Sequence, residues 1–506
     1  MTERKRRWPL LLGGFFWLIA SFLLVVCPWY AGAFKVTFRE LIYTLTTPMT
    51  GVGADIVADG VAACLPGILW WMLPYLLLAF LADYNRVTDI LWQKLHGTIV
   101  RRVLRRVLPL LCAAMVIAGL VAAEQNTQFV EYLQSVSRQT TLYEDYYVDP
   151  KQVSVTPPKE KKNLICIYLE SMETTYADEA NGGHYPVQLM PRLTQLAREE
   201  LTFTDKEAGI LGGHHNPECT RWTMAALLAT SSGVPFSIPV EQNVMNMYQD
   251  FAPGLTTFGD ILARDGYVQE FLCGSDSEFG GRRNYFTQHG GYEIFDLFTA
   301  RETGYVAPDY YVFWGYEDSY LYTIARDEAT RLYETGKPFN LTFLTVDQHH
   351  WDGYVCSDCG TEYDEQAANV IACADRQAAD FIDWCKQQPF YEDTVIVLVG
   401  DHPRMDEALV GDTPYYERTM YNAILNPQKT PAGETTHRVF TPMDMFPTML
   451  SALGYDIEGS RLALGTDLFS GKPTLAEEIG YDRLNEECGS YSPWFVENIC
   501  RPKETP

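Results

Sequence analysis

Three uncharged runs dominate the first quarter of the chain. Residues 8–34 and 60–82 contain no charged side chain, and residues 107–123 form a shorter run of the same kind. About 20 consecutive apolar residues are enough for a helix to cross the hydrocarbon core of a bilayer, and the third run is near the lower limit. The pattern therefore predicts a membrane anchor of three transmembrane helices within residues 1–124.

Basic residues flank these runs unevenly. Residues 4–7 are all basic and precede the first run, and the connection 83–106 carries six basic residues against two acidic ones. Because cytoplasmic loops of membrane proteins are enriched in Lys and Arg, this bias places the N-terminus and the 83–106 connection in the cytoplasm. Three crossings then place everything after Glu124 on the extracytoplasmic side. A cleaved signal peptide is the alternative for the first run, but the run lacks a small-residue cleavage pattern and further spans follow it.

The rest of the chain alternates between strand-like and helix-like segments. Residues 125–162 are polar and contain prolines, which favours a linker, and residues 163–506 are long enough for a large folded domain. Apolar runs predict strands at 163–169, 200–204, 267–272, 340–346, 394–400 and 421–425, and helical periodicity predicts helices at 188–198, 220–230, 256–264, 318–335, 364–387 and 442–453. This alternation predicts an α/β domain whose mostly parallel central sheet is covered by helices.

The charge balance narrows the class of partner. The chain carries a formal net charge of −26, yet its predicted cytoplasmic segments are basic, so the external part holds the acidic excess. An acidic domain does not bind nucleic acid through bulk electrostatics. The charge pattern therefore argues against nucleic acid as a partner, and the three uncharged runs predict the lipid bilayer as one.

The sequence leaves open which cysteines form disulfides and which stay as free thiols. Three of the twelve cysteines lie in membrane runs, which leaves nine outside, and an odd number requires at least one free thiol. Cys166, inside a predicted buried strand, is the best candidate for that thiol. Cys356-Ser-Asp-Cys359 is typical of a small disulfide clip or one half of two bridges. A structural zinc site would need a second close pair, which the sequence lacks.

Candidate metal ligands follow two of the predicted strands. Glu170 comes directly after strand 163–169, and Asp401 and His402 come directly after strand 394–400. Open α/β sheets bind their ligands at the carboxyl ends of such strands, and two carboxylates with one imidazole suit a hard or borderline divalent ion. Thr220, at the start of predicted helix 220–230, offers a hydroxyl that such an ion would activate. The alternative hydroxyl, Thr223, falls inside that predicted helix.

Three segments carry a resemblance to a known family. They are Ile167-Tyr-Leu-Glu-Ser-Met-Glu173, Trp222-Thr-Met-Ala225 and Thr345-Val-Asp-Gln-His-His350. In combination with the anchor-then-domain plan, they resemble the lipoteichoic acid synthase and phosphoglycerol transferase group of the alkaline phosphatase and sulfatase superfamily, nearest to the branch that decorates periplasmic glucans. The likeness extends over roughly residues 163–455.

The resemblance implies a role for each candidate residue. It implies one divalent ion, Mn²⁺ with Mg²⁺ or Zn²⁺ as alternatives, and assigns as its ligands Glu170, Thr220, Asp401 and His402. Thr220 would also be the catalytic nucleophile, because the stretch from Thr220 to Gly233-Val-Pro235 has the spacing of the family. The residues implied in substrate binding are His349, His350, Arg282 and Arg283.

Two positions depart from the family pattern. The histidine that lipoteichoic acid synthases carry before Gly-Asn is replaced by Cys273-Gly-Ser, and the serine shortly after Asp-His is replaced by Met405 or Asp406. Both departures concern the specificity for the headgroup or the acceptor. They leave the implied central chemistry unchanged.

The resemblance implies an enzyme of the bacterial cell membrane, multi-pass, with an extracytoplasmic catalytic domain. Phosphatidylglycerol would be the donor, a glycan or polyglycerophosphate hydroxyl the acceptor, and diacylglycerol the released product, through a phospho-threonine-type covalent intermediate. A phosphoethanolamine transferase of the same superfamily is the main alternative. A sulfatase would need Cys-x-Pro-x-Arg, and Cys219-Thr-Arg-Trp-Thr223 lacks the Pro and the Arg. A non-enzymatic membrane sensor is the alternative from a different class, and the intact set of candidate residues argues against it.

Overall fold

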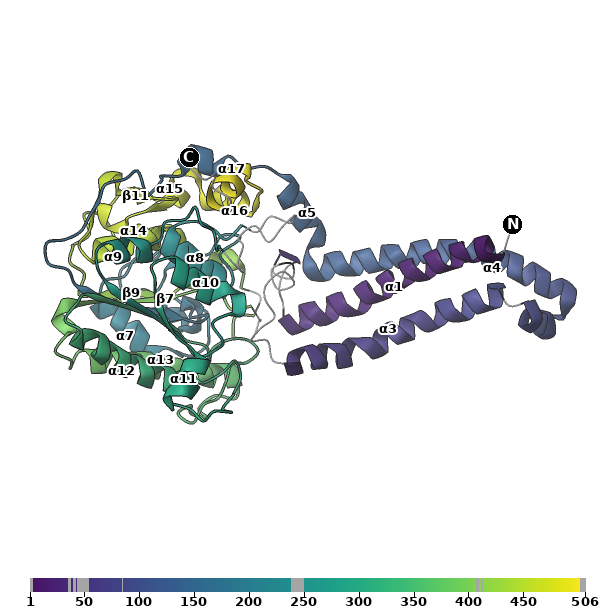
Figure 1. Ribbon diagram of the computed structural model, residues 1–506, viewed down its shortest axis with the longest axis horizontal. Coiled ribbons are helices and arrows are strands. Elements are labelled where there is room, and N and C mark those ends of the chain that lie inside the picture. Colours follow the sequence, from purple (N-terminus) through teal and green to yellow (C-terminus); the bar gives the residue numbers. More distant parts are fainter. Residues whose placement is uncertain are drawn as a thin grey trace. The chain divides into compact units, whose positions relative to one another are not determined.

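The computed structural model describes residues 3–34, 38–39, 42, 54–83, 85–237, 250–405, 409–411 and 413–500. The chain divides into two compact units, one within residues 1–134 and one made mainly of residues 135–506 (Figure 1). The first is helical and the second is an α/β domain. Asp406, at one of the two positions that depart from the family pattern, lies outside the described residues.

The N-terminal unit consists of α1 (Glu3–Phe34), α3 (Ala54–Asp83) and α4 (Asn85–Thr127). Each holds a segment long and apolar enough to cross a membrane: Pro9–Gly32, Gly60–Asp83 and Ile99–Thr127. Small residues allow close approach, since a Cβ at Gly119 would lie 3.1 Å from backbone atoms of Ala20. The three predicted helices are confirmed, and the third is longer than its uncharged core.

The segment expected to be a linker is largely folded into the domain. It forms α5 (Phe129–Ser137), α6 (Leu142–Tyr146) and β1 (Val155–Thr156), and β1 pairs with β10 (Asp456–Ile457). Leu142 and Tyr143 are buried, and the Tyr143 ring stacks on Trp494 at 5.6 Å. The polar composition of residues 125–162 concealed these few apolar anchors, and the second compact unit takes in residues 135–162 together with the rest of the domain.

A six-stranded sheet forms the centre of the domain. Its strand order is β5-β4-β6-β2-β7-β9, with bounds Glu293–Phe295, Val268–Cys273, Phe339–Leu344, Asn163–Leu169, Thr394–Gly400 and Asn422–Leu425. The first five strands are parallel and β9 is antiparallel to β7. The predicted mostly parallel sheet is confirmed. The strand predicted at 200–204 is reduced to one bridge between Leu201 and Ile424, and the short β5 was not predicted.

Helices cover both faces of the sheet, which explains the near-continuous apolar strands. Along β2, Leu164, Cys166 and Tyr168 pack on one face, and the intervening residues pack on the other. The first face is covered by α8 (Thr223–Ser232), α9 (Phe258–Arg264) and α14 (Pro442–Ala452), and the second by α7 (Pro191–Glu199), α12 (Asp318–Glu334) and α13 (Gln366–Cys385) (Figure 1).

Shorter elements complete the domain. They are β3 (His214–His215) paired with β8 (Thr419–Met420), β11 (Arg461–Leu462) paired with β12 (Gly465–Thr466), and the helices α10 (Arg282–Gln288), α11 (Leu297–Thr303), α15 (Leu475–Ile479), α16 (Tyr481–Gly489) and α17 (Pro493–Phe495). The last three helices belong to the C-terminal segment, where no helix was predicted. Cys488 of α16 and Phe495 of α17 are buried in the same core as α8.

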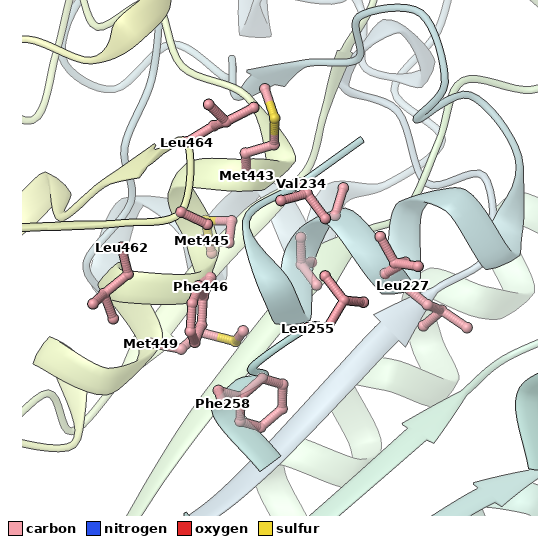
Figure 2. Close-up of a cluster of buried hydrophobic side chains, with 14 of the residues drawn as sticks. Leu227, Val234, Leu255, Phe258, Met443, Met445, Phe446, Met449, Leu462 and Leu464 are labelled. Carbon is pink, nitrogen blue, oxygen red and sulfur yellow. The ribbon is translucent and has the colours of Figure 1, made fainter. Parts of the chain in front are cut away.

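Methionine-rich packing fixes α8 in place. Met443, Met445, Phe446 and Met449 of α14 are fully buried in the cluster that also contains Leu227 of α8 (Figure 2). Burying one such side chain stabilises the fold by roughly 1.5–3 kcal/mol. The start of α8 is therefore held rigidly relative to the sheet.

Candidate active site

The carboxyl ends of β2 and β7 bring three of the predicted ligands together. Leu169 and Gly400 are the last paired residues of these neighbouring parallel strands, so the residues that follow them lie side by side. His402 Nε2 is 3.4 Å from Glu170 Oε1 and 3.5 Å from Asp401 Oδ2, and all three side chains are buried. We call Glu170, Asp401 and His402 the acid–histidine cluster.

The hydroxyl beside this cluster belongs to Thr223, not to Thr220. Thr223 Oγ1 lies 3.2 Å from His402 Nε2 and 3.3 Å from Glu170 Oε2. The Thr220 hydroxyl instead donates to the Pro217 carbonyl at 2.7 Å, within a turn that precedes the helix. Helix α8 begins at Thr223, with Trp222 as its extended N-cap, and this corrects the predicted start at 220. Thr223 is thus the first helical residue, and the reason for setting it aside does not hold.

The donor atoms fit a divalent cation. Two ligands about 2.1 Å from one ion are about 3.0–3.4 Å apart in octahedral or tetrahedral coordination, close to the separations observed here. Asp401 Oδ1 accepts the backbone N–H groups of Ser171 and His402, whereas Asp401 Oδ2 has no hydrogen-bond partner among the described residues. His402 Nδ1 lies 2.9 Å from the Pro403 carbonyl, which leaves Nε2 to act as a ligand. The site therefore has one unsatisfied buried oxygen aimed at the position an ion would take.

The electrostatics of the cluster are those of a site short of positive charge. Burial opposes the charged form of Glu170, but the His402 charge outweighs it and lowers the carboxyl pKa to about 2. Burial and the Glu170 charge raise the pKa of Asp401 to about 7. Burial disfavours the His402 cation, yet Asp401 and Glu170 raise its pKa to about 10. A proton thus resides among these groups at neutral pH, and a bound cation would replace it.

A buried ion pair supports the loop that carries Asp401 and His402. Arg418 Nε donates to Glu173 Oε2 at 2.8 Å, and its Nη2 donates to the Arg404 carbonyl at 2.7 Å. The Arg404 backbone N–H donates to Glu173 Oε1 at 2.6 Å. All three residues are buried. Glu173 is therefore a buried residue that positions the 401–405 loop through these hydrogen bonds.

Arg418→Met should destabilise the domain by roughly 3–5 kcal/mol, because it leaves the Glu173 carboxylate buried without its cation. Urea unfolding followed by intrinsic fluorescence would measure the loss. Arg138→Met is the control, since Arg138 pairs with Glu486 at the exposed surface and should change stability by less than about 1 kcal/mol. Equal effects of the two substitutions would contradict the role of the buried pair.

The two histidines after β6 lie close to the cluster. Their rings stack at 4.2 Å between centroids, and His349 meets the Trp314 ring edge-to-face at 4.9 Å. Burial lowers the pKa of both imidazoles, and the charges of Glu170, His402 and Arg404 act on the same two groups. Both rings are therefore neutral, able to donate and accept hydrogen bonds.

A pair of acids anchors the start of this histidine loop. Asp318 accepts the backbone N–H groups of Val346 and Asp347, and Asp347 Oδ2 accepts the Asp318 N–H. Asp347 Oδ1 is buried and has no hydrogen-bond partner in the described part of the chain. Burial, then the Asp318 charge, raise the pKa of Asp347 to about 10, and burial raises that of Asp318 to about 7. The proton is carried by Asp347, since Asp318 accepts more hydrogen bonds.

This pair should make stability fall as the pH rises. The unfolded carboxyls ionise near pH 4 whereas Asp347 keeps its proton when folded, so the folded state binds more protons and loses up to about 1.4 kcal/mol per pH unit for that proton. Asp347→Asn replaces the neutral acid with a neutral amide and should flatten the dependence between pH 5 and pH 8. Thermal unfolding midpoints of both proteins across that range would test this, and parallel curves would contradict it.

The two predicted arginines are the first residues of helix α10. The Arg282 guanidinium donates to Ser275 Oγ at 3.0 Å and to the carbonyls of Asp276 and Phe279, and it is almost fully buried. Arg283 bonds to Asp296. In the described residues, no hydrogen bond or ion pair joins either side chain to the acid–histidine cluster. Both guanidinium groups are thus bonded to residues near them in the sequence, and the sequence alone does not predict these bonds.

Arg404 is the cation that the sequence reasoning missed. Its side chain is fully buried, and its Nη1 donates to the Gln348 carbonyl at 3.1 Å, directly before the two histidines. The signal was present in the sequence, because Arg404 follows Asp401-His402-Pro403 at the end of a buried strand.

Residues 162–455 match the family model described as Sulfatase. This segment contains the sheet, α8 and every residue of the acid–histidine cluster. The chain belongs to the sulfatase family. The resemblance drawn from its motifs, to the superfamily that unites sulfatases and alkaline phosphatases, is confirmed.

The match between this chain and its curated relatives also includes part of the N-terminal unit. Phosphoglycerol transferase I of Escherichia coli is 31% identical over 480 residues, which cover 92% of this chain and 56% of that protein. The enzyme of the same name from Salmonella paratyphi B is 31% identical over 441 residues, covering 85% of this chain and 53% of that protein. The chain spans about half the length of the curated relatives it matches.

The solved structures that this chain is similar to include a synthase and a transferase. Lipoteichoic acid synthase LtaP from Listeria monocytogenes is 18% identical, with a TM-score of 0.49 over 63% of this chain and 79% of that one. Lipooligosaccharide phosphoethanolamine transferase A from Neisseria meningitidis is 14% identical, with a TM-score of 0.49 over 87% of this chain and 84% of that one.

Proposed function

We propose that this protein transfers phosphoglycerol from phosphatidylglycerol to a hydroxyl of a glycan or of polyglycerophosphate. One observation carries the proposal: a threonine hydroxyl lies within 3.3 Å of both Glu170 and His402, in a site with an unsatisfied carboxylate oxygen. That arrangement is suited to metal-assisted attack on phosphorus. The name shared by the curated relatives supplies the transferred group.

The reaction would proceed in two displacements. Thr223 Oγ attacks the phosphorus of the lipid, an Oγ–P bond forms, and the bond to the diacylglycerol oxygen breaks. Diacylglycerol leaves with a proton, and Thr223 retains the glycerophosphoryl group. An acceptor hydroxyl then attacks the same phosphorus, the Oγ–P bond breaks, and the Thr223 hydroxyl regains a proton. Atoms and charge balance without a further reagent.

The ligand set would hold one divalent ion through Glu170, Thr223, Asp401 and His402. Three oxygens and one nitrogen favour Mn²⁺ or Mg²⁺ and also admit Zn²⁺. When bound, such an ion lowers the pKa of a coordinated hydroxyl and neutralises phosphoryl oxygens.

The start of α8 adds a second source of positive potential. Thr223 is the first residue of this ten-residue helix, so the backbone N–H groups of the first turn point toward the same space. Arg404 and the neutral imidazoles of His349 and His350 would complete the surroundings of the headgroup. His349 is the best placed to hydrogen-bond glycerol hydroxyls, because it is less buried than its neighbour.

The membrane anchor fits a lipid donor. Three candidate spans precede the domain, and the basic residues around them support a cytoplasmic N-terminus and an extracytoplasmic domain. The domain would then act at the outer surface of the cell membrane, beside its lipid and the envelope glycan that accepts the group.

The decisive experiment compares two lipids in matched vesicles. The purified full chain should release diacylglycerol from vesicles that contain phosphatidylglycerol, only with added divalent metal, and His349→Ala should slow this release without lowering metal occupancy. Release from phosphatidylethanolamine alone would replace the proposal with a phosphoethanolamine transferase. Release of inorganic sulfate from a sulfate ester, with no lipid cleavage, would indicate a hydrolase.

A further inference from the structure

A second group of metal-binding side chains lies outside the acid–histidine cluster. The sulfur atoms of Cys356, Cys359 and Cys373 lie within 4.8 Å of one another, and all three cysteines have free thiols. Cys356 and Cys359 lie on the loop after the histidines, and Cys373 lies on α13. The sequence offered only the Cys-x-x-Cys pair. Folding supplies the third sulfur from a helix 14 residues further along.

The separations between these sulfurs match thiolates around a single ion. Cys356 Sγ is 3.6 Å from Cys359 Sγ and 3.8 Å from Cys373 Sγ. In a tetrahedral zinc site with Zn–S bonds of about 2.3 Å, neighbouring sulfurs are about 3.8 Å apart. A disulfide brings two sulfurs to about 2.05 Å and leaves the third out. Here the Cys356 sulfur is 3.6 and 3.8 Å from the other two, an arrangement typical of shared coordination.

The surroundings are those of a supported thiolate site. Gln377 Nε2 donates to Cys356 Sγ at 3.6 Å, and Arg376 donates to the Asp358 carbonyl at 3.4 Å. The amide hydrogen bond favours negatively charged sulfur, and the Arg376 guanidinium holds the loop between Cys356 and Cys359 against α13. Cys356 and Cys373 are buried and Cys359 is partly exposed, so the cysteine group lies just beneath the surface of the domain.

We propose that Cys356, Cys359 and Cys373 bind a thiophilic divalent ion, zinc by its preference for sulfur, as a structural site separate from the acid–histidine cluster. Three soft sulfur donors select a different ion from the oxygen-rich cluster, so the two sites would not compete. The ion would fasten the middle of the histidine loop to α13.

Other contacts already fasten the two ends of this loop segment to the same helix. Gln366 Nε2 donates to the Gly353 carbonyl at 2.8 Å, and Asn369 bonds to both the N–H and the carbonyl of Tyr363. Between these points, residues 354–362 are attached to α13 by the cysteine group and by the hydrogen bond from Arg376 to the Asp358 carbonyl. Removing the ion should therefore loosen the segment that follows His349 and His350, and leave the sheet intact.

Cobalt substitution of the purified full chain would test the proposal. Reduced protein reconstituted with Co²⁺ should show sulfur-to-cobalt charge-transfer absorption in the near ultraviolet, and Zn²⁺ should displace it. Glu170→Gln should keep this absorption, because it alters only the other site. Cys373→Ser should lower the absorption at least tenfold, whereas Cys385→Ser, a matched buried cysteine of the same helix, should retain it.

A second measurement keeps the test valid if Cys373→Ser does not fold. In the wild-type protein, bound Zn²⁺ should protect all three cysteines from alkylation until a chelator is added. The proposal is overturned if reconstituted wild-type protein shows no charge-transfer absorption. It is equally overturned if peptide mapping of unreduced protein finds a disulfide between any two of these cysteines.

Discussion

Replacing Thr223 with alanine will abolish diacylglycerol release, whereas replacing Thr220 with alanine will leave most of it. The Thr223 hydroxyl lies against Glu170 and His402, and the Thr220 hydroxyl is engaged with the Pro217 carbonyl. Loss of a covalent nucleophile costs on the order of 10³-fold or more in turnover. Loss of the Thr220 hydrogen bond costs about 1 kcal/mol of stability and no catalytic group.

Two further readouts locate the covalent step. Rapid quenching of the wild-type protein with phosphatidylglycerol should yield a peptide that carries glycerophosphate on Thr223. Thr223→Ser should recover part of the turnover, because it restores an oxygen at nearly the same position. A glycerophosphate adduct on Thr220 or Cys219, or full turnover in Thr223→Ala, would contradict the assignment.

Asp401→Asn should remove both the bound metal and the turnover. Asp401 Oδ2 is buried without a hydrogen-bond partner among the described residues, so an amide nitrogen at that position would point a donor at the ion. We expect metal affinity to fall by more than about 100-fold, since even residues that only support metal ligands contribute 10- to 100-fold. Equilibrium dialysis with Mn²⁺, followed by elemental analysis, would measure it.

Asp375→Asn provides the matched control for this substitution. Asp375 is also a buried aspartate, and it accepts the backbone N–H groups of Arg192 and Leu193 at the start of α7. Its replacement should lower stability and leave metal occupancy unchanged. If Asp401→Asn retained the metal, or if both variants lost it equally, the acid–histidine cluster would not be the metal site.

The sequence predicted correctly the strands whose apolar residues are buried on both faces of the sheet, and the residues that directly follow them. β2 and β7 have the predicted bounds because they are buried on both faces and, after the first residue of each, every residue is apolar or small. Residues that directly follow those strands were placed correctly for the same reason, since parallel strands end at one edge of the sheet. Glu170, Asp401 and His402 therefore came together as expected.

Prediction failed where the chain turns before an element begins. Thr220 is a residue type common at helix N-caps. In the structure, Cys219 adopts a positive φ of 64° and a turn from Pro217 precedes the helix, which therefore begins three residues later. A shift of three residues exchanges one threonine for another, and only tertiary contacts distinguish them. Cys373 was missed for a related reason, because its partners are remote in sequence and no spacing rule joins a loop pair to a helix.

The pairing of β1 with β10 also decides how a soluble form of the domain should be made. A truncated chain that starts at residue 163 would lack Tyr143 and Val155, and would expose the faces of Trp494 and Phe495 that Tyr143 covers. Exposed aromatic surface of this kind promotes aggregation. Truncation between the last span and Leu142 keeps the strand, the stacked rings and the C-terminal helices together. A secreted form of the domain without its anchor should therefore start in that interval.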